Sequence, residues 1–470
     1  MPQNWVILCL VHAEDKDTKV YANQFIDELC QTPSAAHLRL FCLRNTYLFD
    51  NELNMDANLF ELVFDNQKGY RVLKRVKPFG KINLGDATQL SKILDVVKDA
   101  LPDNKFILMT WDHGYAFGVF NGKAGDSFLN ISTNFTETNH TVTGNTLWKL
   151  KKTLTSDASN NDFVISKVES FKNAREDIFN QINTANLFDL VVQSETDMLL
   201  PEEISLAISK SFDTKKVDLI IMMNCWMQSI DTIYALKDTA DIIIAPQTTI
   251  DFIGYDYYSL ISKIVTTPDI TVSDLASEII KGTREKYKKR NTQIAFNEVV
   301  ISAIRLIPQN ISSLKNIINN IAGELTSALN NNAKFELVRI NRSKTYEFTR
   351  PYLILQPPAL KFYYMVDLVN VIELLENVQI LENFAKQITD WLLNADNLIK
   401  KEVGRNFVDA TGKEIACAMT IYFPNNKEYT LTSTYYHTFY KMPSGHPEKL
   451  KAFARDSKWS SFINIFNDKL

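Results

Sequence analysis

The sequence is poor in cysteine, glycine and proline, and it has no long apolar run. Five cysteines among 470 residues are few, odd in number and widely spread: Cys9, Cys30, Cys42, Cys225 and Cys417. This pattern excludes a disulfide framework and a paired-thiolate zinc site. The low counts of 14 glycines and 14 prolines argue against collagen-like or linker-like segments. We therefore expect no bound metal, no cofactor and, without a run of about 18 apolar residues, no membrane span.

A surplus of basic residues is also missing. The formal net charge of -4 removes the electrostatic basis for nucleic-acid binding. The N-terminal stretch "MPQNWVILCLVHAEDKD" has neither a basic leader nor a small-residue cleavage site, so it is interpreted as a first strand. Free thiols and an N-terminal stretch without a leader favour a cytoplasmic location. Secretion is the alternative if a leader is missing from this chain. The oligomeric state is not determined by these features.

What the sequence does contain, in its first half, is an alternation of apolar runs and helical patterns. Such an alternation predicts an α/β fold with a mostly parallel sheet, and runs that are apolar throughout predict strands covered on both faces. A polar, less regular region is expected between residue 44 and Gly80. The expected strands are Trp5–Val11, Leu38–Leu43, Lys105–Trp111, Val217–Met223 and Ala240–Pro246, and the expected helices include Thr18–Thr32 and Asp86–Leu101.

The length predicts more than one domain. Residues 1–270 carry the α/β pattern, with a polar insertion at about 122–194. Residues 271–470 are expected to form a mainly helical C-terminal domain with a short β segment. Its predicted elements are helices at Ser273–Lys289, Leu314–Asn330 and Asp367–Lys400 and the β segment Ala416–Pro424.

Two reactive residues follow predicted strands. His113 comes just after Lys105–Trp111, and Cys225 comes just after Val217–Met223. Active groups in open parallel sheets gather beyond the carboxyl ends of strands, and a thiolate near an imidazole can perform nucleophilic chemistry. Gly114 would let a substrate carbonyl approach its backbone N–H. Considered alone, Cys225 is more simply interpreted as a buried thiol, and "DHG" as an ordinary loop. His12, which also follows a predicted strand, is the main alternative to His113.

Several stretches, taken in order, resemble the clostripain family of cysteine peptidases, which are relatives of caspases, legumains and gingipains. The stretch "INLGDATQLSKILDVVKDALPDNKFILMTWDHG" resembles the segment that leads to the catalytic His-Gly. The stretch "VDLIIMMNCWMQSIDTIYALKDTADIIIAPQ" resembles the nucleophile region, and "WVILCLVHAEDKD", "YMVDLVNVIELL", "AMTIYFP" and "DSKWSSFI" resemble further landmarks. The resemblance implies a caspase-like α/β/α sandwich and the hydrolysis of peptide or protein substrates.

By that resemblance, His113 and Cys225 form a catalytic dyad. The Cys225 thiolate would attack the scissile carbonyl to give a thioester acyl-enzyme, and His113 would protonate the leaving amine. The backbone N–H groups of Gly114 and Cys225 would stabilise the oxyanion.

The sequence departs from the family where the S1 pocket is expected. Members that cut after Arg or Lys usually carry carboxylates at the positions of Met223 and Ile253. A buried cation without a carboxylate costs several kcal/mol, so we expect the enzyme not to prefer Arg or Lys at P1. Asp251 or Asp256 could restore a basic preference. The alternatives are a proteolytically silent, peptide- or partner-binding relative and an acyl transferase that uses the same residues.

Maturation by cleavage between the catalytic His and Cys is common in this family. The polar insertion is the natural place for such a cut, being expected to be exposed. A self-cut after Lys151, Lys152 or Lys167 would need a basic P1 preference. We therefore expect an uncut chain.

Overall fold

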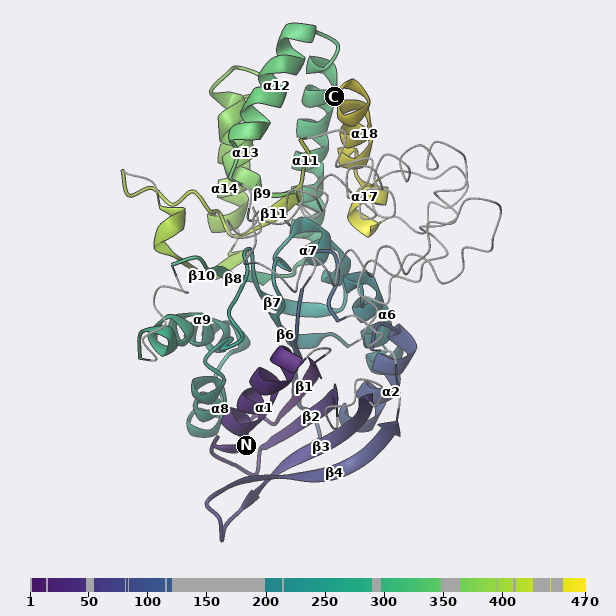
Figure 1. Cartoon of the computed structure of the whole chain (residues 1–470), viewed down its shortest axis with the longest axis vertical. Helices are drawn as coiled ribbons and strands as arrows, with labels where there is room; N and C mark the ends of the chain where they lie inside the picture. Colours follow the sequence, from purple (N-terminus) through teal and green to yellow (C-terminus); the bar gives the residue numbers. More distant parts are fainter. Residues whose placement is uncertain are drawn as a thin grey trace, which may run out of the picture.

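A nine-stranded sheet organises the molecule, with the strand order β10-β8-β7-β6-β5-β1-β2-β3-β4. The computed structural model describes residues 2–13, 16–47, 55–80, 82, 84–114, 116–120, 199–213, 215–289, 297–346, 348, 364–394, 396–408, 411–425, 440 and 451–470. The predicted insertion at 122–194 therefore lies outside the described residues. The chain begins in the purple lower part of Figure 1, and its C-terminal helices lie at the opposite end.

The five central strands are parallel: β1 (Trp5–Ala13), β2 (Leu38–Tyr47), β5 (Lys105–Trp111), β6 (Val217–Met223) and β7 (Ala240–Pro246). Every residue of β6 is buried, and only one residue of β5 is not. Strands covered on both faces have apolar residues throughout. This continuous apolar character explains why the bounds of β5, β6 and β7 agree with those predicted from the sequence.

Antiparallel strands flank the five parallel strands on both sides. At one edge β3 (Met55–Asp65) and β4 (Tyr70–Gly80) form a hairpin on β2. At the other edge β8 (Val300–Arg305) pairs with β7, and β10 (Leu398–Val403) pairs with β8. The expectation of an irregular region up to Gly80 is wrong. The edge strand β4 is largely exposed and charged, which conceals its β character in the sequence.

Helices cover both faces of the sheet (Figure 1). Apolar residues of α1, α8 and α9 pack on one face, and those of α2, α6 and α7 pack on the other. The result is the predicted α/β/α sandwich. The first group is α1 (Lys16–Cys30), α8 (Tyr257–Thr266) and α9 (Val272–Lys289), and the second is α2 (Ala87–Val97), α6 (Pro201–Phe212) and α7 (Ile230–Leu236).

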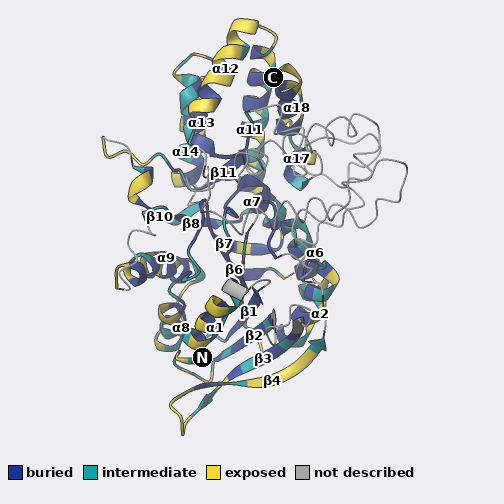
Figure 2. Ribbon diagram, viewed as in Figure 1, coloured by how far each residue is buried: buried dark blue, intermediate teal, exposed yellow. Residues whose placement is uncertain are grey.

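The C-terminal region is mainly helical. It contains α11 (Pro308–Ala328), α12 (Asn332–Lys344), α13 (Leu368–Glu376), α14 (Phe384–Asn394), α17 (Ala452–Asp456), α18 (Trp459–Lys469) and the short helix η3 (Arg405–Phe407). A small sheet joins β9 (Met365–Asp367) to β11 (Thr420–Tyr422). The sides of these helices that face one another are buried, whereas α12 presents exposed residues at the far end (Figure 2).

One sequence expectation differs from this arrangement, and another is not tested by it. The single helix expected at Asp367–Lys400 is wrong, because α13 and α14 are separate helices and β10 begins at Leu398. The domain division at residue 270 stays a prediction, and the central sheet crosses it, because β8 and β10 come from later residues. In the described part of the chain, no helix is both long and apolar enough to cross a membrane.

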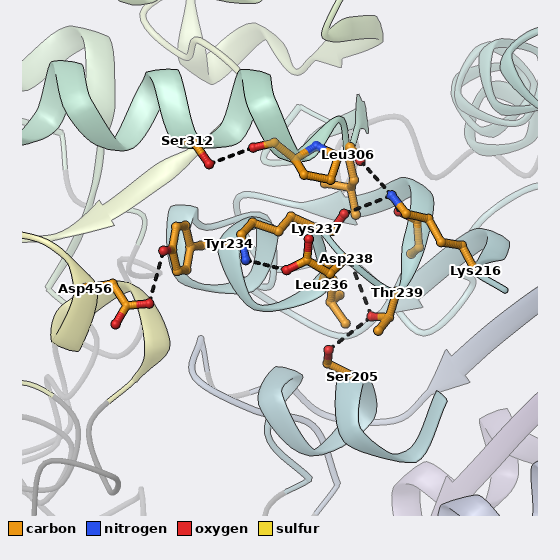
Figure 3. A network of polar contacts seen from close by, with 12 residues as sticks. Ser205, Lys216, Tyr234, Leu236, Lys237, Asp238, Thr239, Leu306, Ser312 and Asp456 are labelled. Carbon is orange, nitrogen blue, oxygen red and sulfur yellow. Dashed lines mark hydrogen bonds and ion pairs between the residues drawn. The ribbon is translucent and has the colours of Figure 1, made fainter. Parts of the chain in front are cut away.

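Polar contacts fix α7, the helix that follows the predicted nucleophile strand, to its surroundings (Figure 3). The Tyr234 hydroxyl donates to Asp456 Oδ2 at 3.1 Å, which joins α7 to α17. At the end of α7, Thr239 Oγ1 donates to Ser205 Oγ of α6 at 3.1 Å. Lys216, just before β6, donates to the carbonyl of Leu306 at 3.3 Å. The β6–α7 unit is therefore bonded both to α6, which precedes it in the sequence, and to later residues of the C-terminal region.

Candidate active site

The two predicted catalytic residues lie at the ends of neighbouring strands. β5 and β6 are parallel, and their last register pair is Trp111 with Met223, so His113 and Cys225 each lie two residues further along. Gly114 packs directly on the second strand end. A Cβ atom added to Gly114 would lie 2.6 Å from the carbonyl carbon of Asn224 and closer still to the backbone N and O of Cys225. Only glycine allows this approach of the two backbones.

Asn224 holds the two strand ends together. Its fully buried side chain donates from Nδ2 to the carbonyls of Asp112 at 3.0 Å and His113 at 2.9 Å. Its Oδ1 accepts a hydrogen bond from Thr110 Oγ1. Buried polar groups that are fully bonded in this way specify one local arrangement. The residue before Cys225 thus sets the backbone that carries His113.

Cys225 is half-buried beside the loop that follows β7. Its Sγ accepts from the N–H of Ile250 at 3.5 Å and lies 3.8 Å from the Ile250 carbonyl oxygen. The next residue, Trp226, has a φ of 61°, in the left-handed region that L residues rarely adopt. Its indole donates to the carbonyl of Phe348 at 2.7 Å, which holds this turn. Local strain of this kind clusters at functional sites.

The other four cysteines are poor candidates for a nucleophile. Burial raises the pKa of the Cys42 thiol to about 12 and raises the pKa of Cys9 well above its ordinary value. Burial, with smaller effects of Asp27 and Asp367 respectively, also raises the pKa of Cys30 and Cys417. The thiolate is the nucleophilic form, so these environments disfavour reactivity.

The rival histidine, His12, is placed differently. It lies on β1, which is separated from β6 by β5. Its side chain is 1% exposed, and its Nδ1 contacts Oδ2 of the equally buried Asp112. His113, in contrast, is half-buried and packs edge-on against the Phe252 ring, with the ring centroids 5.5 Å apart. The strand order therefore favours His113 as the partner of Cys225.

The predicted S1 residues lie in and beside the loop 250–256. Met223, at the end of β6, is 2% exposed and reaches Gly254, where an added Cβ atom would lie 2.9 Å from Met223 Cγ. Gly254 has a φ of 61°, which suits glycine. Ile253, the next residue back, is half-buried. Met223 and this loop therefore adjoin one another close to Cys225.

Both aspartates that could restore a basic preference are engaged with backbone groups. Asp251 Oδ1 accepts from the N–H of Ile253 at 3.0 Å. Asp256 caps α8, where its Oδ1 accepts from the N–H of Ser259 at 3.0 Å. Its Oδ2 faces α9, because an added Cβ at Gly282 would lie 2.9 Å from it. Asp256 thus points toward the helix layer.

A buried cation that was not predicted from the sequence lies beneath this loop. Lys286 of α9 is 7% exposed, and its Nζ donates to both carboxylate oxygens of Glu28, at 2.9 and 2.8 Å. It also donates to the carbonyls of Ile253 at 3.0 Å and Tyr255 at 2.7 Å. The sequence spacing does indicate this burial. Lys286 follows the buried Ile279 by seven residues and so lies on the apolar face of the helix.

Comparison with known proteins decides the family. The model of the clostripain family matches residues 187–466, which is more than half of the chain and includes Cys225 but not His113. The chain belongs to the clostripain family. It is accordingly a cysteine peptidase, which acts on peptide bonds. A search of the curated proteins gave no match.

Solved structures agree with the fold of this clostripain-family chain. A secreted C11 cysteine protease from Bacteroides thetaiotaomicron, "iotapain", is 15% identical, with a TM-score of 0.51 and coverage of 97% of this chain and 99% of that chain. A structure of a secreted C11 protease from the same organism with an irreversible peptide inhibitor is 13% identical, with a TM-score of 0.53 and coverage of 97% and 99%. An inactive zymogen C11 protease from Parabacteroides distasonis is 13% identical, with a TM-score of 0.55 and coverage of 98% and 99%.

Metal ligands do not gather in the described part of this clostripain-family chain: no group of three or more His, Cys, Asp or Glu side chains there could hold an ion.

Proposed function

We propose that this peptidase cleaves peptide bonds with Cys225 as nucleophile and His113 as proton donor. The observation that carries the proposal is the register of β5 and β6, which places the two residues equally far beyond the pair Trp111–Met223. The close packing of Gly114 on Cys225 supports it, because it leaves the two residues on one rim of the sheet.

The reaction follows from these positions. The Cys225 thiolate attacks the scissile carbonyl carbon, and the oxygen becomes an oxyanion near the backbone N–H groups of Gly114 and Cys225. The C–N bond then breaks, and His113 gives its proton to the leaving amine. Water hydrolyses the thioester, which releases the acid and restores the thiol.

The S1 pocket is proposed to be uncharged, with walls from Met223 and Ile253. Met223 and Ile253 carry no carboxylate to pair with an Arg or Lys side chain, and the Asp256 carboxylate caps α8 and faces α9. A methionine wall adapts to irregular apolar shapes. Apolar pockets discriminate by about 1–3 kcal/mol per methylene, so the P1 preference is broad.

The first test applies a cysteine-directed activity probe to the wild type, two variants of the proposed dyad and one control variant. Wild type labels at Cys225 and hydrolyses peptides, Cys225→Ala does neither, and His113→Ala loses activity by about 10²–10⁴-fold while still being slowly alkylated. A His12→Gln chain is the matched control and keeps its label. A wild-type chain that folds but neither labels nor cleaves would support the silent peptide-binding relative. Loss of labelling in the His12 variant alone would move the role to His12.

The second test is a scan of P1 residues in fluorogenic peptides. Wild type turns over apolar or small P1 residues better than Arg or Lys, and Met223→Asp raises the relative turnover of P1-Arg peptides. Met223→Asn controls for size and polarity without charge. A strong Arg preference in wild type would mean that Asp251, Asp256 or another carboxylate serves S1. Acyl transfer would appear as amide products when a nucleophilic amine is added.

A further inference from the structure

A column of aromatic rings runs from the protein interior to the surface beside His113. Trp111, 1% exposed, packs against Phe252 with ring centroids 5.8 Å apart. Phe252 in turn stacks on Tyr21 of α1, with centroids 5.0 Å apart and an interplanar angle of 15°. Tyr21 is 38% exposed. The outer two rings thus form an apolar surface that is supported from below.

The loop that carries Phe252 touches both proposed catalytic residues. Its first residue, Ile250, contacts Cys225 Sγ through its backbone N–H and carbonyl. Two residues later, Phe252 lies edge-on against the His113 ring at 5.5 Å. A peptide whose scissile bond lies between Cys225 and His113 would therefore place a neighbouring side chain within reach of Phe252 and Tyr21.

We propose that Tyr21 and Phe252 form an apolar subsite that binds a large aliphatic or aromatic side chain of the peptide substrate next to the scissile bond. This inference rests on the proposed function. Aromatic side chains offer large contact areas at a low cost in conformational entropy, and Phe252 is already immobilised between Trp111, His113 and Tyr21. An apolar side chain that covers these rings would bury a large contact area.

The two residues have separable roles. Among the described residues, Tyr21 stacks on Phe252, and Phe252 in turn contacts the His113 ring. Phe252 both binds the substrate side chain and holds the imidazole. Replacement of Tyr21 should therefore act on substrate preference, whereas replacement of Phe252 should lower kcat as well.

The experiment scans each peptide position around a fixed P1 residue with Ala, Leu and Phe. At one position wild type prefers Leu or Phe, and Tyr21→Ala lowers the ratio of kcat/KM for Phe over Ala by about fivefold. Phe252→Ala lowers the same ratio and also kcat for every peptide. Tyr258→Ala, which removes a tyrosine that is 48% exposed on α8, is the control and keeps the wild-type ratio.

Binding of the same peptides to Cys225→Ala, followed by fluorescence anisotropy, tests the subsite without catalysis. The Leu or Phe preference is expected there too, and Tyr21→Ala in that background is expected to weaken it. If the wild-type chain bound peptides with this preference but never cleaved them, the proposed function would be contradicted and the subsite would still be supported. Equal binding and cleavage of Ala and Phe peptides, or equal ratios for Tyr21→Ala and Tyr258→Ala, would overturn the subsite.

Discussion

Gly114 and Asn224 are the residues that bring the proposed dyad together. Asn224 satisfies two carbonyls of the β5 end, at 3.0 and 2.9 Å, and Gly114 lets that end press against the backbone of Cys225. Asn224 need not touch a substrate to matter, and this packing role of Gly114 is separate from the oxyanion contact proposed for its N–H. Their contribution is to keep His113 and Cys225 at a constant separation, and catalysis is sensitive to misplacement of about 1 Å.

Gly114→Ala is predicted to separate the two strand ends. The added methyl group would overlap backbone atoms of Asn224 and Cys225, which cannot move as a flexible side chain does. We expect a loss of about 1–3 kcal/mol in the free energy of unfolding and a fall in kcat of about 10²-fold.

Urea denaturation and peptide hydrolysis measure these effects. The matched control is Gly323→Ala in α11, where an added Cβ meets nothing within 4 Å. That change should raise stability by about 0.5–1 kcal/mol and leave kcat unchanged. If the two variants behaved alike, the close packing at Gly114 would not matter.

At the scale of elements, side chains of α1 and α9 pack beneath the loop after β7 and hold it in place. Glu28 of α1 and Lys286 of α9 form a pair whose side chains are 14% and 7% exposed, and Lys286 also bonds two loop carbonyls. The Lys286 ammonium lies 5.2 Å from the centroid of the Tyr257 ring. The proposed S1 loop therefore depends on the packing of two helices that are far apart in sequence.

Lys286→Met is predicted to destabilise the fold and loosen the S1 loop. This change takes away the buried ammonium that both Glu28 oxygens accept from, and the loss of one partner of a buried pair costs about 3–5 kcal/mol. We expect a lower midpoint in urea and a higher KM with a smaller change in kcat. The double variant Glu28→Gln, Lys286→Met also removes the Glu28 charge and should recover part of the stability.

Lys288→Met is the control in the same helix. Lys288 pairs with Glu285 at 2.7 Å, but both side chains are exposed to water, which screens the pair, so its loss should hardly change stability. Equal midpoints for Lys286→Met and Lys288→Met would contradict the fastening role.

The whole molecule is joined across the predicted domain division by buried polar contacts. Gln247, after β7, donates to Asp367 at 3.1 Å and accepts from the N–H of Ala418 at 3.1 Å. In α7, the buried Asp231 accepts from the Tyr440 hydroxyl at 2.6 Å. Burial raises the pKa of Asp231 to about 6, although the bond from Tyr440 opposes this effect. The join between the sheet and the C-terminal region therefore contains a titrating group.

Asp231 is predicted to make stability fall as the pH rises. Its folded-state pKa is raised, so its stabilising contribution is fully present below the unfolded-state pKa of about 3.9. That contribution is lost as the pH rises through about 6. The total effect is on the order of 3 kcal/mol, since one pKa unit corresponds to about 1.4 kcal/mol.

Asp231→Asn keeps an acceptor for Tyr440 and removes the titration. Relative to wild type, the variant should be more stable at pH 7.5 than at pH 4, as measured by urea denaturation at both values. Asp238→Asn, at a side chain that is 60% exposed, should show no such pH-dependent difference. A constant difference between Asp231→Asn and wild type at the two pH values would refute the assignment.

The sequence by itself determined the central strands, the capped start of α2 and the places of His113 and Cys225 just after β5 and β6. The reason is local: β5, β6 and β7 are apolar throughout and end at polar residues, and Asp86 bonds the N–H of Thr88 as a helix cap should. Tertiary structure alone decided what no local pattern encodes. Several features depend on long-range pairing: the order of the strands, the antiparallel strands β3, β4, β8 and β10, the contact of Phe252 with His113 and the burial of Lys286. Charged edge strands and a buried lysine look like surface features in a sequence, because only the packed partners show which side chains lose their contact with water.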